Sequence, residues 1–595
     1  MPTIFRVCTT AGLIAAGLLL TPKYADACGG TFCDSAVPNP MPVDQTGENV
    51  IFVMGGDKAE VHIQISIDPN TNAQKFAWMI PLASVPDFAV GSQPFFNQVL
   101  SGTVPTYDID RSFETCDFGD DDDDGGYDDE CGYGAGSTGG GGDGGGETSY
   151  GDETAGDPGP QVLVQETVGA FDVVVLQDTE LAPIQMWLET NGYNWDPVAG
   201  PILEQYLAEG NVIAALKLTT GAGLADVHPI TLRYEGLEVC FPLRLTRIAA
   251  VDDMDIRVFV LAEQRAAPTN FKHVLVNPLK IDWLNYAANY KEVIAHAVDA
   301  DMADGRAFVT EYAGTSGAVN RDGISSPQWD HQAFVGLDPV AVVEQLNVQG
   351  LADCHSELAC TWNHPLIYGL LLEHLPPPDG VDPLEFYADL ASFAGDIDLV
   401  KWDTGVAFAS ALLHRVIKPG QAAIELLDTW PYLTRMYTTI SPNEMMEDPI
   451  FHINPDLGDV ANLRIVGQYF MCNGDSEATL PDGRKVYAPG SSWPDIPGEL
   501  WWEEEVQTIA FKGAPMTLVN NTAAIDKVLD EWNQSHNWRR KLPQGAPRSA
   551  RSCGGYDSAG ANDRSSGCGC AAGGSRLPGL LAPALLLLRR RRRHP

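Results

Sequence analysis

Alternating hydrophobic and polar residues run through the first part of the chain. Residues 61–67 carry apolar side chains at every second position, and polar side chains, His62 among them, lie between. Successive side chains of a strand point to opposite faces, so this pattern predicts a half-buried antiparallel strand with His62 on its solvated face. Further strands are predicted at residues 75–81, 173–176, 212–218, 241–245 and 256–260.

Two segments within this β-rich stretch have a helical spacing of apolar residues instead. The apolar residues between Leu181 and Leu188 fall on one helical face, and an Asn-Gly pair at 191–192 ends that helix. Pro197 begins a second helix, which ends at Gly210. Because strands and helices do not alternate regularly, we expect an α+β fold with an antiparallel sheet and two inserted helices.

After residue 285 the spacing of apolar residues becomes mainly helical. We therefore expect a β-rich α+β domain over residues 28–285 and a mainly helical, then mixed, region over 286–540. The Ser-, Gly- and Arg-rich residues 541–567 are typical of a flexible tether. Helices are predicted at residues 290–298, 339–346, 365–375, 405–416 and 523–532.

A segment of different composition interrupts the β-rich domain at residues 117–159. It is rich in Gly and Asp and contains neither Lys nor Arg, so it is predicted to be a disordered insertion. Asp120, Asp122 and Asp124 resemble the start of a calcium-binding loop, since oxygen ligands suit that ion. Cys131 stands where such a loop requires Glu, so a solvated acidic loop is favoured over calcium binding.

The first 27 residues have the parts of a secretory signal peptide. Arg6 supplies the basic region, residues 11–20 are apolar, and residues 25–27 form a small-residue cleavage site that leaves Cys28 first. A lipoprotein signal, in which Cys28 is acylated, is the alternative. Ala25-Asp26 departs from that signal, because Leu is preferred at the first of these positions and a charge is disfavoured at the second.

Residues 568–595 form a second sorting signal. Small residues around Cys570 precede a short apolar stretch at 577–588, and arginines occupy 589–593. Twelve residues of helix span ~18 Å, too little for a bilayer core of ~30 Å. This order resembles the MYXO-CTERM sorting tag of myxobacterial surface proteins, which implies processing near Cys570 and retention at the outer cell surface. A retained, poorly apolar membrane helix is the alternative.

The chain contains 12 cysteines, and export places them in an oxidising compartment that favours disulfides. A zinc site at Cys354-His355, Cys360 and His364 is disfavoured, because that spacing fits no standard zinc motif. Cys240, Cys472, Cys553 and Cys568 have no assigned partner. Proximity in sequence suggests the pairs Cys28 with Cys33, Cys116 with Cys131, and Cys354 with Cys360.

Charge restricts the possible partners. The chain has 80 acidic and 37 basic residues, a formal net charge of −43, which argues strongly against nucleic-acid binding. We expect contact with a membrane only through the C-terminal tag. The hydrophobic fraction of 44% is sufficient for globular cores.

Recognisable catalytic motifs are missing from the sequence. It contains no Gly-x-Ser-x-Gly, His-Glu-x-x-His or phosphate-binding glycine loop, and we expect no cofactor. Gly474-Asp475-Ser476 lacks the glycines that would shape an oxyanion site. A hydrolase whose catalytic residues are scattered along the chain remains an alternative, and it would show Ser or Cys hydrogen-bonded to an oriented His.

Several short segments follow one another in a specific order. They are ACGG at 27–30, FAWMIPL at 76–82, FDVVVL at 171–176, WL and NGY within 187–193, PLRLT at 242–246, IDWL at 281–284 and RMYTTISP at 435–442. This order resembles the bacterial family called domain of unknown function 2330, over most of residues 28–455. The resemblance implies an exported protein of unsettled function and supplies no catalytic residues. We therefore expect an exported, surface-anchored, non-enzymatic binding or envelope-organising protein, with a secreted hydrolase as the alternative.

Overall fold

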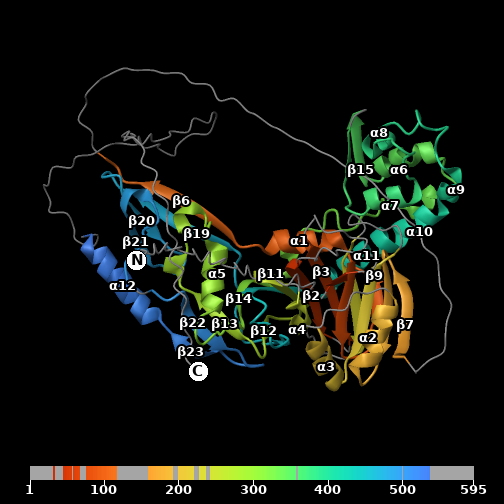
Figure 1. The fold of residues 1–595 in the computed structure, drawn as a ribbon. Coiled ribbons are helices and arrows are strands. Elements are labelled where there is room, and N and C mark those ends of the chain that lie inside the picture. Colours follow the sequence, from red (N-terminus) through yellow and green to blue (C-terminus); the bar gives the residue numbers. More distant parts are fainter. Residues whose placement is uncertain are drawn as a thin grey trace, which may run out of the picture. The chain divides into compact units, whose positions relative to one another are not determined.

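The protein has a mixed α+β fold, which confirms the predicted class (Figure 1). One large sheet, several smaller sheets and a series of helices share the described residues. Among these residues, no helix combines the length and the apolar character that a membrane crossing requires. The computed structural model describes residues 31–33, 45–55, 58–67, 76–116, 159–191, 199–219, 227–235, 242–248, 250–356, 359–498 and 500–536.

The large sheet contains ten strands from both sides of residue 285. The division into separate regions at residue 285 stays a prediction. In spatial order the strands are β23 (Met516–Asn520), β22 (Glu503–Thr508), β13 (Lys272–Val276), β14 (Ala307–Thr315), β17 (Tyr432–Ile440), β11 (Ala250–Ala262), β2 (Gln45–Gly55), β3 (Lys58–Ile67), β10 (Ile230–Glu235) and β5 (Asp87–Val90).

The large sheet is mixed, so the prediction of an antiparallel sheet is wrong for this sheet. β2 pairs with β11, and β13 with β14, in parallel. Parallel neighbours need a long connection that returns the chain to the same end of the sheet. β2 and β11 have such a connection, because β3 to β10 lie between them in the sequence.

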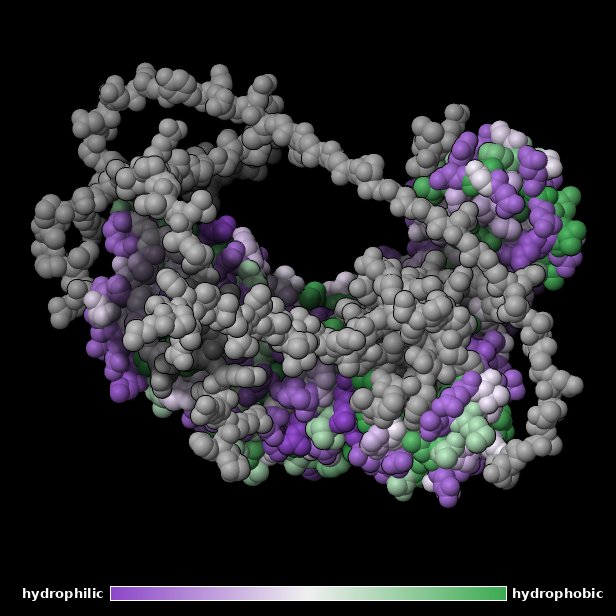
Figure 2. Space-filling model, viewed as in Figure 1, coloured by the Kyte–Doolittle hydropathy of each residue, from purple (hydrophilic) through white to green (hydrophobic). Residues whose placement is uncertain are grey.

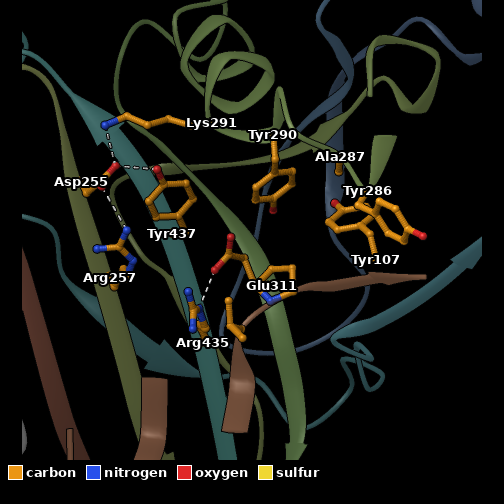
Figure 3. A pocket seen from close by; sticks show the side chains of 12 residues that line it. Tyr107, Asp255, Arg257, Tyr286, Ala287, Tyr290, Lys291, Glu311, Arg435 and Tyr437 are labelled. Atoms are coloured by element: carbon orange, nitrogen blue, oxygen red, sulfur yellow. Dashed lines mark hydrogen bonds and ion pairs between the residues drawn. The ribbon is translucent and has the colours of Figure 1, made fainter. Parts of the chain in front are cut away.

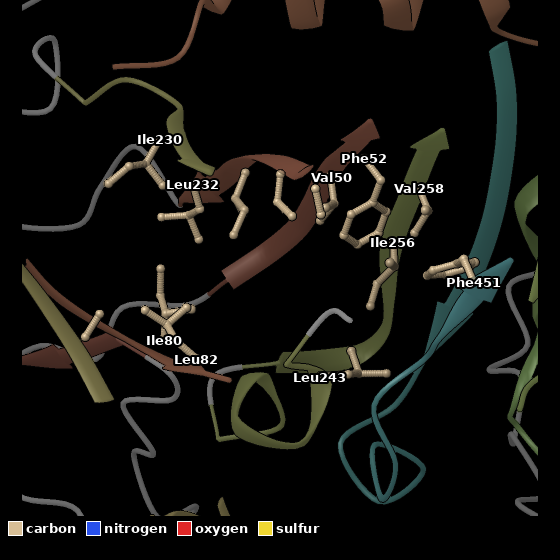
Figure 4. Close-up of a cluster of buried hydrophobic side chains, with 14 of the residues drawn as sticks. Val50, Phe52, Ile80, Leu82, Ile230, Leu232, Leu243, Ile256, Val258 and Phe451 are labelled. Carbon is tan, nitrogen blue, oxygen red and sulfur yellow. The ribbon is translucent and has the colours of Figure 1, made fainter. Parts of the chain in front are cut away.

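A second sheet of five antiparallel strands packs face to face on the large sheet. Ile80 and Leu82 of the smaller sheet belong to the same buried cluster as Val50 and Phe52 of β2 (Figure 4). This cluster forms the interior of a sandwich of two sheets. The five strands are β1 (Thr31–Cys33), β4 (Phe76–Leu82), β9 (Val212–Leu218), β8 (Phe171–Gln177) and β7 (Gln161–Val168).

The outer face of the five-stranded sheet is covered by two helices, α2 (Leu181–Thr190) and α3 (Gly200–Ala208). Met79 and Ile213 alternate with the inward-facing residues of their strands and pack against Leu188 and Leu203 of these helices. Both helices confirm the sequence predictions.

Two local predictions are wrong. The segment expected to be a strand at 241–245 contains the short helix α4 (Leu243–Thr246). Pro242 lacks the N–H that a strand ladder uses, and one helical turn directs Leu243 and Leu245 into two different buried clusters. His62 is only 4% exposed, because α1 (Gln93–Thr103) covers its face of the sheet and Phe95 packs edge-on against the imidazole.

The opposite face of the large sheet is covered in two separate places. Helices α1 and α11 (Lys418–Thr429) cover Leu433 of β17, and α5 (Tyr290–Val298) covers Tyr437 of the same strand. Residues two apart in a strand share a face, so Arg435 lies between the two covered areas. This strip of the sheet carries the polar site described below.

A four-stranded sheet packs against α12 (Thr522–Ser535) and the buried Trp283. The helix predicted at 523–532 is thereby confirmed. The four strands are β21 (Lys485–Ala488), β20 (Ser476–Thr479), β19 (Leu463–Phe470) and β6 (Thr106–Phe113). Two short strands, β12 (Ala266–Pro268) and β18 (Phe451–Ile453), form a separate pair.

The helices predicted between residues 339 and 416 form around a core of their own, which includes Leu370 and Phe408. Leu399 and Val400 on α9 (Leu399–Trp402) are 64% and 88% exposed, and hydrophobic side chains gather over this helix in Figure 2. The elements are α6 (Val342–Val348), β15 (Ala352–Ser356), β16 (Ala359–Trp362), α7 (Ile367–His374), α8 (Pro383–Ala388), α9 (Leu399–Trp402) and α10 (Val406–Leu412).

Candidate functional site

A polar cavity of about 270 Å³ lies over the strip of the large sheet between α1 and α5 (Figure 3). We call it the tyrosine pocket, because four phenol side chains contribute to its lining. It is lined by Asp255 and Arg257 of β11, Glu311 of β14, Arg435 and Tyr437 of β17, Val104, Pro105 and Tyr107 before and within β6, and Tyr286, Ala287, Tyr290 and Lys291 at the start of α5.

Glu311 reaches the pocket through an irregularity in β14. Thr310 pairs with Met436 and Tyr312 pairs with Arg435, so Glu311 is the extra residue of a β-bulge. Its carboxylate and the Arg435 guanidinium form an ion pair of 2.5 Å, and the two residues are only 1% and 4% exposed. Arg435 also donates to the carbonyl of Leu100 at 3.1 Å. The charges of Glu311 and Arg435 are therefore balanced by each other within the protein.

Asp255 is the centre of a second polar group in the pocket. Its carboxylate accepts a hydrogen bond of 2.6 Å from the Tyr437 hydroxyl and lies 3.0 Å from both Arg257 and Lys291. Burial by itself raises the pKa of Asp255, but the hydrogen bonds from Tyr437 and Lys291 and the charge of Arg257 outweigh it, so the pKa lies below its usual value. The group Asp255–Arg257–Lys291 thus carries one surplus positive charge.

Phenol side chains form the wall opposite Asp255. Arg464 donates to the Tyr107 hydroxyl at 2.5 Å, and the rings of Tyr107 and Tyr290 lie 5.7 Å apart. Burial raises the pKa of Tyr107 to about 12 and that of Tyr290 well above its usual value, so both stay protonated at neutral pH. The Tyr290 hydroxyl is buried, and the Arg464 guanidinium that donates to Tyr107 also interacts with it.

The lining offers binding groups and contains no Ser, Cys or His side chain. Guanidinium, ammonium and phenol groups donate hydrogen bonds, and the phenol rings supply apolar faces. Among the described residues, the serines within reach of a histidine are Ser410 with His414 and Ser535 with His536, each a local pair outside the pocket lining. The pocket is therefore suited to binding a small polar molecule.

One chain of groups does resemble a catalytic triad. Thr231 lies 3.0 Å from Nδ1 of His62, and Nε2 of His62 lies 3.0 Å from Glu60. Thr231 is only 1% exposed, and Arg233 holds Glu60 through two hydrogen bonds of 3.0 Å. These residues line neither of the two cavities described in the structure, and we assign them a structural role across β3 and β10.

The cysteine predictions have mixed outcomes. Cys354 and Cys360 are joined by a disulfide, as the spacing suggested, which removes both thiolates from the disfavoured zinc site. Cys116 pairs with Cys472 and not with Cys131, so that prediction is wrong. The reason is that β6 and β19 run parallel in register, with Phe113 opposite Phe470, which brings the ends of both strands together.

Several predicted positions lie outside the described residues. They are the signal peptide at 1–27, the acidic insertion from 117 to 158 with Asp120, Asp122, Asp124 and Cys131, the partner Cys28 with the side chain of Cys33, the cysteines Cys240, Cys553, Cys568 and Cys570, and the C-terminal tag. Ser476 of the Gly-Asp-Ser segment is described; it is fully buried and accepts a hydrogen bond from Gln468 at 3.1 Å.

Sequence reasoning missed the tyrosine pocket. A signal was present, because Asp255 and Arg257 place charges in a strand whose alternate residues, Ile256 and Val258, are apolar. A strand face with such charges either is exposed to solvent or lines a polar site. The sequence does not show that Glu311 and Arg435 lie on the same face.

Comparison with known proteins gives one match. A family model described as an uncharacterised protein conserved in bacteria (DUF2330) matches residues 22–337. Neither the curated proteins nor the solved structures give a significant match. The lining residues from Val104 to Glu311 fall within the matched range, whereas Arg435 and Tyr437 lie beyond it.

Proposed function

We propose, from the premise that the chain belongs to the DUF2330 family of uncharacterised bacterial proteins, that it is an exported, non-enzymatic binding protein that takes a small ligand into the tyrosine pocket. The observation that carries this proposal is the composition of the lining. It combines hydrogen-bond donors, phenol rings and a cavity of about 270 Å³ with the absence of Ser, Cys and His from its lining. Ligand sites typically combine a concave shape with a few convergent polar groups of this kind.

The proposed location is the outer cell surface, with the C-terminal tag as the anchor. The predicted signal peptide at the N-terminus and the apolar stretch with terminal arginines at the C-terminus support this location. Two disulfides among the described residues agree with an oxidising compartment.

A variant that fills the pocket tests the proposal whatever the ligand is. Val104 lines the cavity and is 42% exposed, so Val104→Trp can fill it without disturbing the core. The measurement is the unfolding midpoint of the exported protein with neutral sugars, sugar acids, amino acids and nucleosides at millimolar concentration. A bound ligand raises the midpoint by mass action. We expect at least one of these compounds to do so in the wild type and not in Val104→Trp.

The matched control is Val348→Trp, at a position that is 65% exposed on α6. This variant should respond to ligand as the wild type does. A panel that stabilises neither protein, or that stabilises Val104→Trp equally, contradicts binding in this pocket. Turnover of ester or glycoside substrates by the wild type would instead support the hydrolase alternative and contradict a non-enzymatic role.

A further inference from the structure

We infer that the tyrosine pocket binds a small carboxylate that also carries hydroxyl groups, the chemical class of sugar acids and hydroxy acids. This inference rests on the proposed function. It follows from three properties of the lining: the unequal pairing of its charges, the position of its free donors, and the size of the cavity.

The charges of the lining are not all available to a ligand. Arg435 is held by Glu311 and by the Leu100 carbonyl, and both charged residues are almost fully buried. Arg257 and Lys291, in contrast, share the single carboxylate of Asp255 and are 26% and 55% exposed. The accessible part of the pocket therefore carries one unit of positive charge that an anion would balance.

Placement of the two cations favours an anion at one end of the cavity. Arg257 and Lys291 both reach the same carboxylate from different elements, β11 and the first turn of α5 (Figure 3). The beginning of a helix also carries a partial positive charge. Guanidinium and ammonium groups bind carboxylates and phosphates through charge-assisted hydrogen bonds, which are stronger than neutral ones. A bound carboxylate would thus lie beside Asp255 without contacting it.

The remainder of the lining is suited to hydroxyl groups. The Tyr290 hydroxyl is buried, shares the Arg464 guanidinium with Tyr107, and lies on the wall that faces Asp255. Tyr286 is 52% exposed and presents a phenol at the rim. Protonated phenols both donate and accept, as sugar hydroxyls require, and their rings pack against C–H groups.

Cavity size limits the ligand to a single small unit. A volume of about 270 Å³ lies just below the range of ~300–1,000 Å³ that is typical of sites for drug-sized ligands. A monomeric sugar acid fits a cavity of this volume better than a polymer segment does. The overall negative charge of the chain also opposes the approach of a long polyanion.

The experiment compares four probes by calorimetry on the exported protein. They are D-glucuronate, neutral D-glucose, D-glucose 6-phosphate and acetate. We expect D-glucuronate to bind at least about tenfold more tightly than D-glucose, since a charge-assisted hydrogen bond contributes that much or more. Acetate, which lacks hydroxyls, should bind more weakly than D-glucuronate. Tighter binding of D-glucose 6-phosphate would show that the preferred anion is a phosphate and would overturn the inference.

Variants assign the binding to the two ends of the pocket. Arg257→Gln should weaken D-glucuronate at least about tenfold and leave any binding of D-glucose unchanged. Tyr290→Phe should weaken D-glucuronate and not acetate. Lys527→Met, on the exposed face of α12, is the matched control for charge and should change neither affinity. The unfolding midpoint of each variant without ligand checks that it is folded.

The outcomes separate this inference from the proposed function. Binding of D-glucose that is lost in Val104→Trp but unaffected by Arg257→Gln would leave the proposed function intact and overturn the carboxylate. D-Glucuronate binding that persists unchanged in Arg257→Gln and Tyr290→Phe would overturn the inference directly. Absence of binding for all four probes would overturn the ligand class, while the wider panel described above still decides whether the pocket binds at all.

Discussion

Three buried histidines, His228, His273 and His364, are kept neutral by their surroundings. Burial lowers the pKa of each from 6.5 to about 4. For His228 the hydrogen bonds also fix the tautomer, because Nε2 accepts from the backbone N–H of Ala170 at 3.0 Å and Nδ1 lies 2.8 Å from the carbonyl of Pro229. A proton on Nε2 would break the bond to Ala170.

These histidines predict a loss of stability in mild acid. Each pKa is lower in the folded state than in the unfolded state, so unfolding takes up protons below pH 6.5. The stabilisation is complete above pH 6.5 and is lost as the pH falls toward 4. We expect the free energy of unfolding to fall by about 1.4 kcal/mol per pH unit for each histidine, measured by denaturant titration between pH 7 and 4.

A single substitution isolates one of these contributions. His228→Gln should reduce the number of protons taken up on unfolding by about one, and so lower the slope of the free energy of unfolding against pH. His414→Gln, at an exposed site, is the matched control. A wild-type free energy of unfolding that does not change between pH 6.5 and 4.5 would contradict the prediction.

At the scale of single elements, the disulfide between Cys116 and Cys472 has the widest reach. It joins the ends of β6 and β19 through two cysteines that are 356 residues apart in the sequence, and the ring pair Phe113 and Phe470 stacks beside it. The backbone N–H of Cys472 also donates to the Glu114 carboxylate at 3.0 Å. Because β6 is the edge strand of its sheet and carries Tyr107, the bridge also fastens one wall of the tyrosine pocket.

Removing the Cys116–Cys472 disulfide should lower the free energy of unfolding more than removing the Cys354–Cys360 disulfide. Cys116→Ser with Cys472→Ser opens a loop of several hundred residues, and we expect a loss of ~2–5 kcal/mol in the free energy of unfolding. Cys354→Ser with Cys360→Ser is the matched control, and its short loop should cost less. Denaturant titration of the two double variants provides the comparison. A larger loss in the control pair, or a Cys116–Cys131 bridge in non-reducing peptide maps, would contradict this prediction.

The elements that the sequence predicted correctly are those whose own residues determine them. β8, β9, α2 and α3 follow from their local apolar residues, since the two strands are buried on both faces and each helix buries one face. The prediction for His62 failed because a distant helix, α1, covers the face that the strand pattern marked as polar. The tyrosine pocket could not be predicted for the same reason, because its lining comes from five separated parts of the chain.

At the scale of the whole molecule, the two terminal signals predict where the protein resides. A chain that ends at Gly567 lacks the apolar stretch and the terminal arginines, so we expect it in the growth medium, whereas the full chain should remain with the cells. Immunoblots of cell and medium fractions give the measurement. Equal retention of the two forms would contradict anchoring through the tag.

The acidic insertion links two different sheets, since β6 before it belongs to the four-stranded sheet and β7 after it to the five-stranded sheet. Deletion of Gly119 to Glu130 should leave the fold intact, because this segment has almost no large aliphatic side chain to bury. About 30 residues of linker remain, and they span up to ~100 Å when extended. Thermal unfolding in chelator and in millimolar calcium measures the effect.

A midpoint that falls by more than ~5 °C on this deletion would show that the segment is structural. A rise with calcium in the undeleted protein alone would favour the ordered metal loop over the solvated acidic loop. Cys116 keeps its partner Cys472 in both forms, so the comparison does not change the disulfides.

The order of strands in the large sheet also determines when neighbouring strands can pair during synthesis. β11 is buried between β2, which is synthesised early, and β17, which begins roughly 170 residues after β11 ends. At ~5–20 residues per second, the edge of β11 that pairs with β17 stays unpaired for about 10–30 s during synthesis. Until β17 has been synthesised, this edge of β11 exposes unpaired backbone N–H and C=O groups, which can pair with the strands of other chains.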